Sequence, residues 1–204
     1  MRVGIDFDNT IASYDEPMHQ WAMERGLISP TVPKNKKLIR DAIRELEDGE
    51  SKWRSLQVFC YGPGMSNARP IFGVKEFLAA CKACSVPVWI VSHKTEDANF
   101  GDPNVKLREA ALRWLEAEGF LDTAAFGIGR ERIFFEDTRQ AKIERIRTLG
   151  LTHFIDDLEE TFLEPSFPYA IAKILLSAQP AGNGNGRWRS LASWPEIRKE
   201  VFGL

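Results

Sequence analysis

The sequence contains few cysteines and histidines, and their spacing is irregular. The three cysteines are Cys60, Cys81 and Cys84, and the three histidines are His19, His93 and His153. So few cysteines exclude a disulfide framework, and the histidines lack the i, i+4 spacing of a zinc site. Cys81 and Cys84 have the C-x-x-C spacing of a redox pair, but they close an apolar helical stripe, so we expect buried thiols instead.

A strong net charge and a long apolar run are also missing. The 204 residues carry a formal net charge of -2 with a pI near 6.0, so no electrostatic footprint indicates a nucleic acid polymer or an anionic membrane as partner. No apolar run approaches the ~18 residues of a membrane span, and no charged and apolar leader opens the sequence. We therefore expect a cytoplasmic protein with one domain, to which an insertion can be added.

The first ten residues are the most informative. An apolar stretch ending at Ile5 runs into Asp6-Phe7-Asp8-Asn9-Thr10. On an extended strand Asp6 and Asp8 point the same way while Phe7 turns toward a core. Two carboxylates this close require a hard cation such as Mg²⁺, a shifted pKa, or both. A strand followed by an ordinary acidic turn explains the pentapeptide equally well.

A helical block follows this strand. Apolar residues recur at helical spacing between residues 15 and 26 and between 38 and 46, and a shorter helical stretch covers 53–59. Residues 11–72 exceed what a simple crossover needs. We expect them to form a small helical cap, inserted into a core made of residues 1–10 and 73–204.

From residue 73 onward helical and strand patterns alternate. Helices are expected near 73–84, 103–118, 138–149 and after 194, and strands near 86–91, 132–135, 153–155 and 170–176. The glycine- and asparagine-rich residues 179–186 are expected to form a surface loop. This alternation predicts an α/β fold with a Rossmann-like, doubly wound parallel sheet.

Ligands bind at the carboxyl ends of the strands in such a sheet. The polar residues expected there are Asp6 and Asp8 on the first strand, Ser92 on a second, and Asp156 and Asp157 on a third, with Lys142 at the start of the preceding helix. Each has a simple structural explanation, as a cap or a solvated helix charge. Such explanations do not account for all of these residues occurring together at strand ends.

These residues resemble the four ordered motifs of the haloacid dehalogenase (HAD) superfamily. The first motif is matched by Asp6-Phe7-Asp8-Asn9-Thr10, the second by Ser92, the third by Lys142 and the fourth by Asp156-Asp157. The resemblance implies a Rossmann-like core, Mg²⁺ dependence and phosphoryl transfer through an aspartyl-phosphate. An aspartate at the position of Asp8 is typical of the phosphatase branch and is lacking in the dehalogenases.

On this resemblance Asp6 is the nucleophile and Asp8 the general acid and base. Ser92 and Lys142 hold the phosphoryl oxygens, and Thr10 and His93 are further candidates for phosphate binding. The expected metal ligands are Asp6, Asp8 through its backbone carbonyl, and Asp156 or Asp157, with the choice between the last two open.

Two other functions are compatible with the sequence. A receiver-like signalling module also combines acidic residues, a phosphorylated aspartate, a hydroxyl and a lysine, although its acidic pair belongs on the first strand. A HAD-like binding scaffold without turnover is the other alternative. For an enzyme we expect a small phosphorylated metabolite as substrate, either a sugar phosphate or a nucleoside monophosphate. The sequence predicts no oligomeric state.

Overall fold

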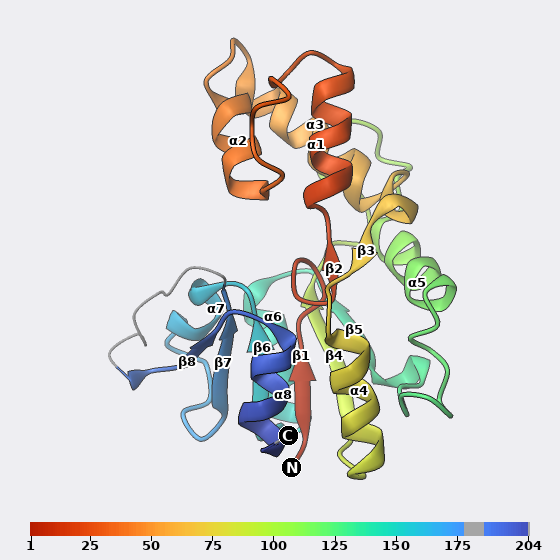
Figure 1. Cartoon of the computed structure of the whole chain (residues 1–204), viewed down its shortest axis with the longest axis vertical. Coiled ribbons are helices and arrows are strands. Elements are labelled where there is room, and N and C mark those ends of the chain that lie inside the picture. The colour runs from red at the N-terminus through yellow and green to blue at the C-terminus, as the bar shows by residue number, and fades with distance from the viewer. Residues whose placement is uncertain (178–185, 204) are drawn as a thin grey trace. The chain divides into compact units, whose positions relative to one another are not determined.

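The computed structural model describes residues 1–177 and 186–203, which fall into two compact units (Figure 1). One unit comprises residues 1–12, 70–94 and 115–204, and the other comprises residues 13–69 and 95–114. We call them the sheet unit and the helical unit and describe each by itself. Most of the surface loop expected at 179–186 lies outside the described residues.

The sheet unit contains a six-stranded parallel sheet. Its strands are β1 (Val3–Ile5), β4 (Val88–His93), β5 (Ile133–Glu136), β6 (His153–Asp156), β7 (Ala172–Leu176) and β8 (Arg189–Leu191). They follow the order β5-β4-β1-β6-β7-β8, and every neighbouring pair is parallel. The prediction of an α/β, Rossmann-like sheet is confirmed.

Strand β1 is central and closely packed. Ile5 lies opposite Ile90 of β4 and Ile155 of β6, and all three are fully buried, as expected for a strand covered on both faces. A Cβ atom on Gly4 would lie 2.3 Å from Leu151 Cδ1. The neighbours of β1 therefore approach so closely that only glycine fits in the middle of this strand.

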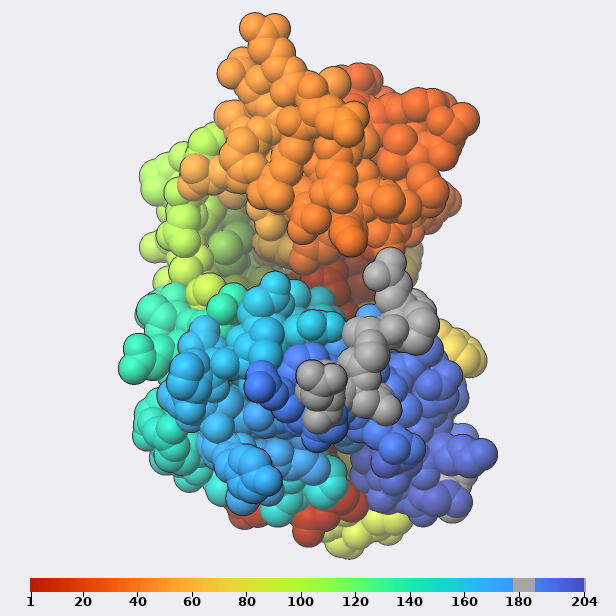
Figure 2. Space-filling view, turned by 90° about the vertical axis from the view of Figure 1, so that its left-hand side faces the viewer, coloured from red at the N-terminus to blue at the C-terminus, as the bar shows by residue number. Residues whose placement is uncertain are grey.

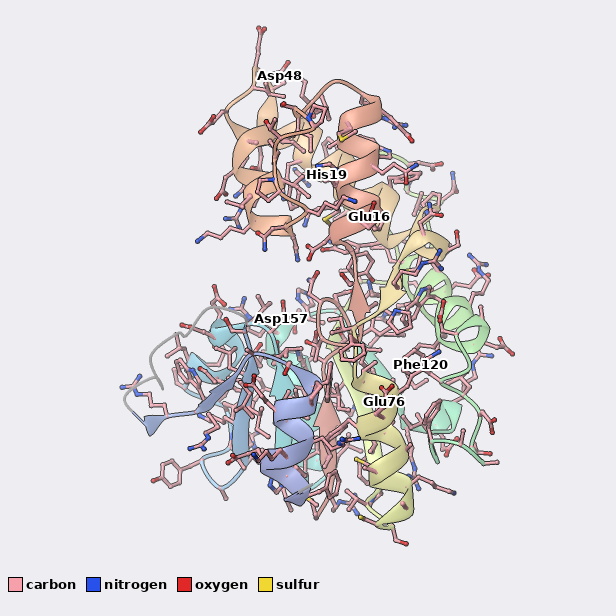
Figure 3. The ribbon with its side chains drawn as sticks, viewed as in Figure 1. Glu16, His19, Asp48, Glu76, Phe120 and Asp157 are labelled. Carbon is pink, nitrogen blue, oxygen red and sulfur yellow. The ribbon has the colours of Figure 1, made fainter. Side chains whose placement is uncertain are left out.

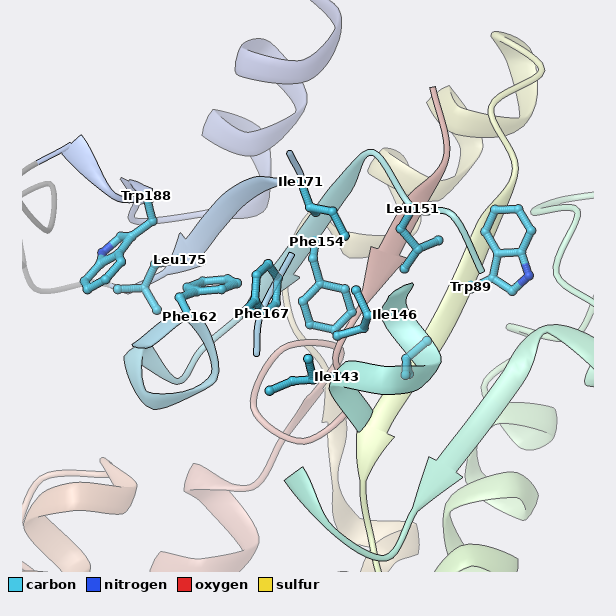
Figure 4. Close-up of a cluster of buried hydrophobic side chains, with 11 residues drawn as sticks. Trp89, Ile143, Ile146, Leu151, Phe154, Phe162, Phe167, Ile171, Leu175 and Trp188 are labelled. Carbon is cyan, nitrogen blue, oxygen red and sulfur yellow. The ribbon is translucent and has the colours of Figure 1, made fainter. Parts of the chain in front are cut away.

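Helices cover both faces of the sheet. They are α4 (Val74–Ala83), α6 (Arg139–Thr148), α7 (Glu159–Leu163) and α8 (Trp194–Phe202). On one face α4 packs against α8, with the Phe77 and Trp194 rings 4.9 Å apart (Figure 1). On the other face a hydrophobic cluster joins α6 and α7 to the strands, and Phe154 of β6 lies among its aromatic rings (Figure 4). In Figure 2 the α7 segment, in light blue, forms part of the surface of this unit.

The two cysteines of the C-x-x-C pair differ in their exposure. Cys81 is buried in α4, and burial raises the pKa of its thiol to about 12. This thiol therefore stays protonated and inert at neutral pH. Cys84 was expected to be buried as well, but it is exposed, because α4 ends at Ala83 and its C-cap faces solvent.

The helical unit is built from two segments of the chain. The first carries α1 (Asp15–Glu24), α2 (Lys36–Arg44) and α3 (Gly49–Tyr61), and the second carries most of α5 (Leu107–Ala117). Trp114 of α5 donates a hydrogen bond from Nε1 to the carbonyl oxygen of Ala68, at 3.1 Å. The helical periodicity indicates α5 as well, near residues 103–118, but the sequence pattern assigns it to the core of residues 73–204.

The chain passes between the units at four places, near residues 12, 69, 94 and 114. At the first two, β2 (Ala12–Ser13) and β3 (Arg69–Pro70) form a separate two-stranded sheet. Among the described residues no helix is long and apolar enough to cross a bilayer.

Candidate active site

The site is built where β1, β4 and β6 end. Asp6 directly follows β1, Ser92 lies near the end of β4, and Asp156 is the last residue of β6. Because β1 pairs with both other strands, these residues become neighbours, and the Asp6 backbone N–H donates to the Ile155 carbonyl oxygen at 2.9 Å. Asp157 lies at the same edge of the sheet (Figure 3).

Lys142 joins two of the carboxylates. Its Nζ donates to Asp6 Oδ1 at 2.6 Å and to Asp156 Oδ2 at 2.7 Å, and all three side chains are buried. Thr138 caps the N-terminus of α6 by accepting a hydrogen bond from the Ala141 N–H, which fixes the turn that carries the lysine. Burial alone would lower the pKa of Lys142, but the two carboxylates outweigh it and raise the pKa above its usual value.

The environment of Asp6 disfavours the charged form of its carboxyl group. Burial raises the pKa of its carboxyl group to about 7. The Lys142 ammonium opposes this shift, while the negative charges of Asp156 and Asp8 add to it. A cation beside Asp6 would therefore stabilise its ionised form.

Three carboxylates can bind such a cation. Asp6, Asp156 and Asp157 each offer an oxygen, and these atoms lie within 4.8 Å of one another. Asp156 Oδ1 also accepts a hydrogen bond from the Leu158 N–H at 2.9 Å, and Asp157 Oδ1 lies 3.4 Å from the Thr10 hydroxyl, which donates to it. Carboxylate oxygens are the ligands that Mg²⁺ prefers in proteins, so these residues fit a magnesium ion.

The net charge of the site also favours binding of a divalent cation. Four carboxylates, those of Asp6, Asp8, Asp156 and Asp157, and two ammonium groups, those of Lys94 and Lys142, lie together here. Fully ionised, this set has an excess of two negative charges, which a divalent cation would neutralise.

Ser92 provides a buried hydroxyl group that no described residue uses in a hydrogen bond. The residue is 1% exposed, and its Oγ makes no hydrogen bond to any described residue. Burying a hydroxyl group without a hydrogen-bond partner destabilises the folded protein unless a bound ligand supplies that partner. This supports the expectation that Ser92 contacts a bound group such as a phosphoryl oxygen.

His93 and Thr10 are held by backbone contacts. His93 Nε2–H donates to the Asp137 carbonyl oxygen at 3.1 Å, and burial lowers the pKa of this imidazole. The carbonyl oxygen of Thr10 accepts a hydrogen bond from Trp194 Nε1 at 2.9 Å, which ties the turn after β1 to α8. Thr10 also reaches Asp157, whereas the contact made by His93 points to the loop before α6.

Lys94 belongs to the site, although the sequence did not indicate it. Its Nζ lies 2.9 Å from Asp8 Oδ2, and its side chain is 2% exposed. A lysine just after a strand usually lies at a solvent-exposed strand end, so the sequence pattern did not place Lys94 in the site. The only signal was its spacing, because Lys94 follows Ser92 by two residues and extended side chains two apart share a face.

Comparisons with known proteins identify the fold. No family model matches the chain, and no curated protein matches it in sequence. Among solved structures, a predicted phosphatase from Clostridium acetobutylicum has a TM-score of 0.60 at 13% identity over 100% of this chain and 98% of its own. A haloacid dehalogenase-like hydrolase from Xanthomonas campestris has a TM-score of 0.56 at 16% identity, covering 100% of this chain and 95% of its own.

A third solved structure, described as a dehalogenase, has a TM-score of 0.54 at 12% identity and covers 100% of this chain and 97% of its own. The chain therefore has the HAD-like fold that the four motifs implied. This fold occurs in proteins described as phosphatases and as dehalogenases, so the reaction must be argued from the side chains.

Proposed function

We propose that this protein is a magnesium-dependent phosphatase that hydrolyses a small phosphate monoester through an aspartyl-phosphate on Asp6. The observation that carries the proposal is the buried Asp6 carboxylate, held by Lys142, with the Asp8 carboxylate on the same turn. A carboxylate nucleophile and a second carboxylate for proton transfer are what a two-step hydrolysis needs. A dehalogenase would have no need for a second carboxylate at the position of Asp8.

The first step transfers the phosphoryl group to the protein. An Asp6 oxygen attacks phosphorus, the bond from phosphorus to the ester oxygen breaks, and the departing oxygen takes a proton from the Asp8 carboxyl group. The Lys142 ammonium and the Ser92 hydroxyl hold the phosphoryl oxygens, on which charge is spread in the transition state. Thr10 and His93 are further candidates for contacts with the phosphate.

The second step releases phosphate. Asp8, now a carboxylate, takes a proton from a water molecule whose oxygen attacks phosphorus. The bond from phosphorus to the Asp6 oxygen then breaks, and the Asp6 carboxylate is regenerated.

The Mg²⁺ ion would be held by Asp6, by the backbone carbonyl of Asp8, and by Asp156 or Asp157. When bound, it offsets the repulsion between the anionic Asp6 and the anionic phosphate and acts as a Lewis acid on a phosphoryl oxygen.

We propose that the substrate is a sugar phosphate or a nucleoside monophosphate. Both segments of the helical unit follow strands that carry site residues, since residues 13–69 come after β1 and residues 95–114 come after β4. Insertions at these ends of a sheet are where specificity commonly develops. We therefore propose that the helical unit acts as a cap that admits small monoesters.

Hydrolysis of p-nitrophenyl phosphate by the purified protein tests the proposal. We expect steady turnover with Mg²⁺ and none with EDTA. Labelling of one aspartate without turnover would favour a receiver-like phospho-acceptor, and no reaction would favour a binding scaffold. A screen of phosphate monoesters would then identify the substrate class.

Magnesium is expected to stabilise the folded protein. The site has an excess of negative charge, so a cation that binds the folded state but not the unfolded chain raises the free energy of unfolding by mass action. At a concentration one hundred times the Kd this is about 2.7 kcal/mol. Thermal melting in millimolar MgCl₂ and in EDTA measures the effect, with KCl of equal ionic strength as control. Equal melting temperatures would contradict the metal site.

Asp8→Asn should separate the two steps. An activated aryl phosphate needs little protonation of its leaving group, so Asp6 should still be phosphorylated, whereas water activation is lost. With p-nitrophenyl phosphate we expect about one equivalent of rapid nitrophenol release and then turnover lowered by about 10²- to 10⁴-fold. If release and turnover slowed equally, Asp8 would be a metal ligand only.

A further inference from the structure

Lys94 is a second buried lysine in the site, and the mechanism above does not use it. We propose that Lys94 is a positioning residue that holds the Asp8 carboxylate for hydrolysis of the aspartyl-phosphate. This inference rests on the proposed phosphatase function. It assigns Lys94 a role through Asp8 and no contact with the substrate.

Contacts hold both the backbone N–H and the side-chain ammonium of Lys94. Its backbone N–H donates to the Glu136 carbonyl oxygen at 2.9 Å, which ties the residue to the end of β5. Its ammonium lies 2.9 Å from Asp8 Oδ2 and 5.6 Å from the centre of the Phe7 ring. A buried ammonium held at these points restricts where the Asp8 carboxylate can lie.

Asp8 needs such support because of where it lies. It is on the turn that follows β1, and the next residue, Asn9, has a φ of 57°, in the left-handed region. The Asp8 side chain is 19% exposed, whereas that of Lys94 is 2% exposed. The less exposed lysine therefore anchors the more exposed carboxylate.

The two buried lysines form ion pairs with different carboxylates. Lys142 contacts Asp6 and Asp156, and Lys94 contacts Asp8. Lys142 thus holds the nucleophile, while Lys94 holds the group that accepts a proton.

In the second step the water oxygen bonds to phosphorus, the water proton moves to Asp8, and the bond between phosphorus and the Asp6 oxygen breaks with its electron pair returning to Asp6. Without Lys94 the carboxylate would sample positions from which it cannot reach this water. A misplacement of about 1 Å can cost about 10²-fold in rate.

Lys94→Met tests this role in rapid-mixing experiments with p-nitrophenyl phosphate and Mg²⁺. We expect the first equivalent of nitrophenol to appear within about threefold of the wild-type rate, and later turnover to fall by about 10- to 100-fold. Phosphorylated protein should accumulate. A slower first release would place Lys94 on the substrate phosphate and overturn the proposal, and a reduced amount of release would assign it a structural role only.

A double variant makes the test independent of the stability of Lys94→Met. If Lys94 acts through Asp8, turnover by Asp8→Asn/Lys94→Met should lie within about threefold of that by Asp8→Asn. A further loss of tenfold or more would overturn the proposal, even if Lys94→Met alone fails to fold.

Lys75→Met is the matched control. Lys75 also has a carboxylate and an aromatic ring as partners, with Nζ 3.5 Å from Glu118 Oε2 and 5.3 Å from the Phe120 ring centre, but it lies outside the site. Its turnover should stay within about twofold of wild type. If the wild-type protein hydrolyses no ester, the proposed function fails, and this inference with it. If the wild type is active but Lys94→Met turns over normally, only this inference fails.

Discussion

Asp6→Asn is expected to lower the hydrolysis of p-nitrophenyl phosphate by about 10⁴-fold or more, because the amide keeps the shape of the side chain but cannot attack phosphorus. The loss should affect the first step, so no phosphorylated protein should form. Rapid-mixing measurement of nitrophenol release, together with trapping of the acylphosphate in acid, distinguishes this result from the Asp8→Asn result, in which release persists.

The folded state should survive this substitution. Burial raises the pKa of Asp6 to about 7, which means that the folded protein disfavours the charge that the variant removes. The amide oxygen can still accept a hydrogen bond from Lys142. We therefore expect Asp6→Asn to melt in EDTA no lower than the wild type. Near-wild-type turnover by this folded variant would refute the assignment of Asp6 as nucleophile.

Lys142→Met should have the largest effect on stability. The ammonium is the shared partner of Asp6 and Asp156, and both carboxylates stay buried when it is removed. Breaking a buried charge network in this way costs about 3–5 kcal/mol. For a chain of this size the melting temperature should fall by roughly 6–20 °C. Thermal melting in EDTA measures the loss.

Two comparisons test whether the buried charge network causes this loss of stability, namely the addition of magnesium and the substitution of a more exposed lysine. A divalent cation at the same carboxylates should raise the melting temperature of Lys142→Met more than that of the wild type. Lys75→Met removes a lysine whose side chain is 39% exposed, and such a pair contributes about 0–1 kcal/mol. Equal losses in the two lysine variants would show that the charges around Lys142 do not stabilise the fold.

Much of the site follows from the sequence because strand ends are easy to locate. Apolar runs end at Asp6, Ser92 and Asp156, and a parallel sheet brings such ends together. The structure shows Asp6, Asp156 and Lys142 in direct contact, and the Ser92 hydroxyl buried with no hydrogen-bond partner among the described residues.

Three features could not be predicted, each for a physical reason. Lys94 has the sequence position of a solvent-exposed lysine at a strand end, because periodicity does not show which carboxylate a lysine contacts in the folded protein. The helical stripe of α5 indicates a helix but not the unit in which it packs, so residues 95–114 were not recognised as part of the helical unit. Strand β8 has three residues, of which Arg189 and Ser190 are polar, so it lacks the apolar run of a buried strand.

The central position of β1 has a consequence for the growing polypeptide. The strand pairs with β4 and β6, which follow it by more than 80 and 140 residues. The turn after β1 is held by Trp194, which comes later still. During synthesis β1 can pair with β4 early, but its second partner strand and the contact with Trp194 have to wait until residues 153–194 have left the ribosome. Asp6 and Asp8 therefore gain their full set of neighbours long after they are themselves synthesised.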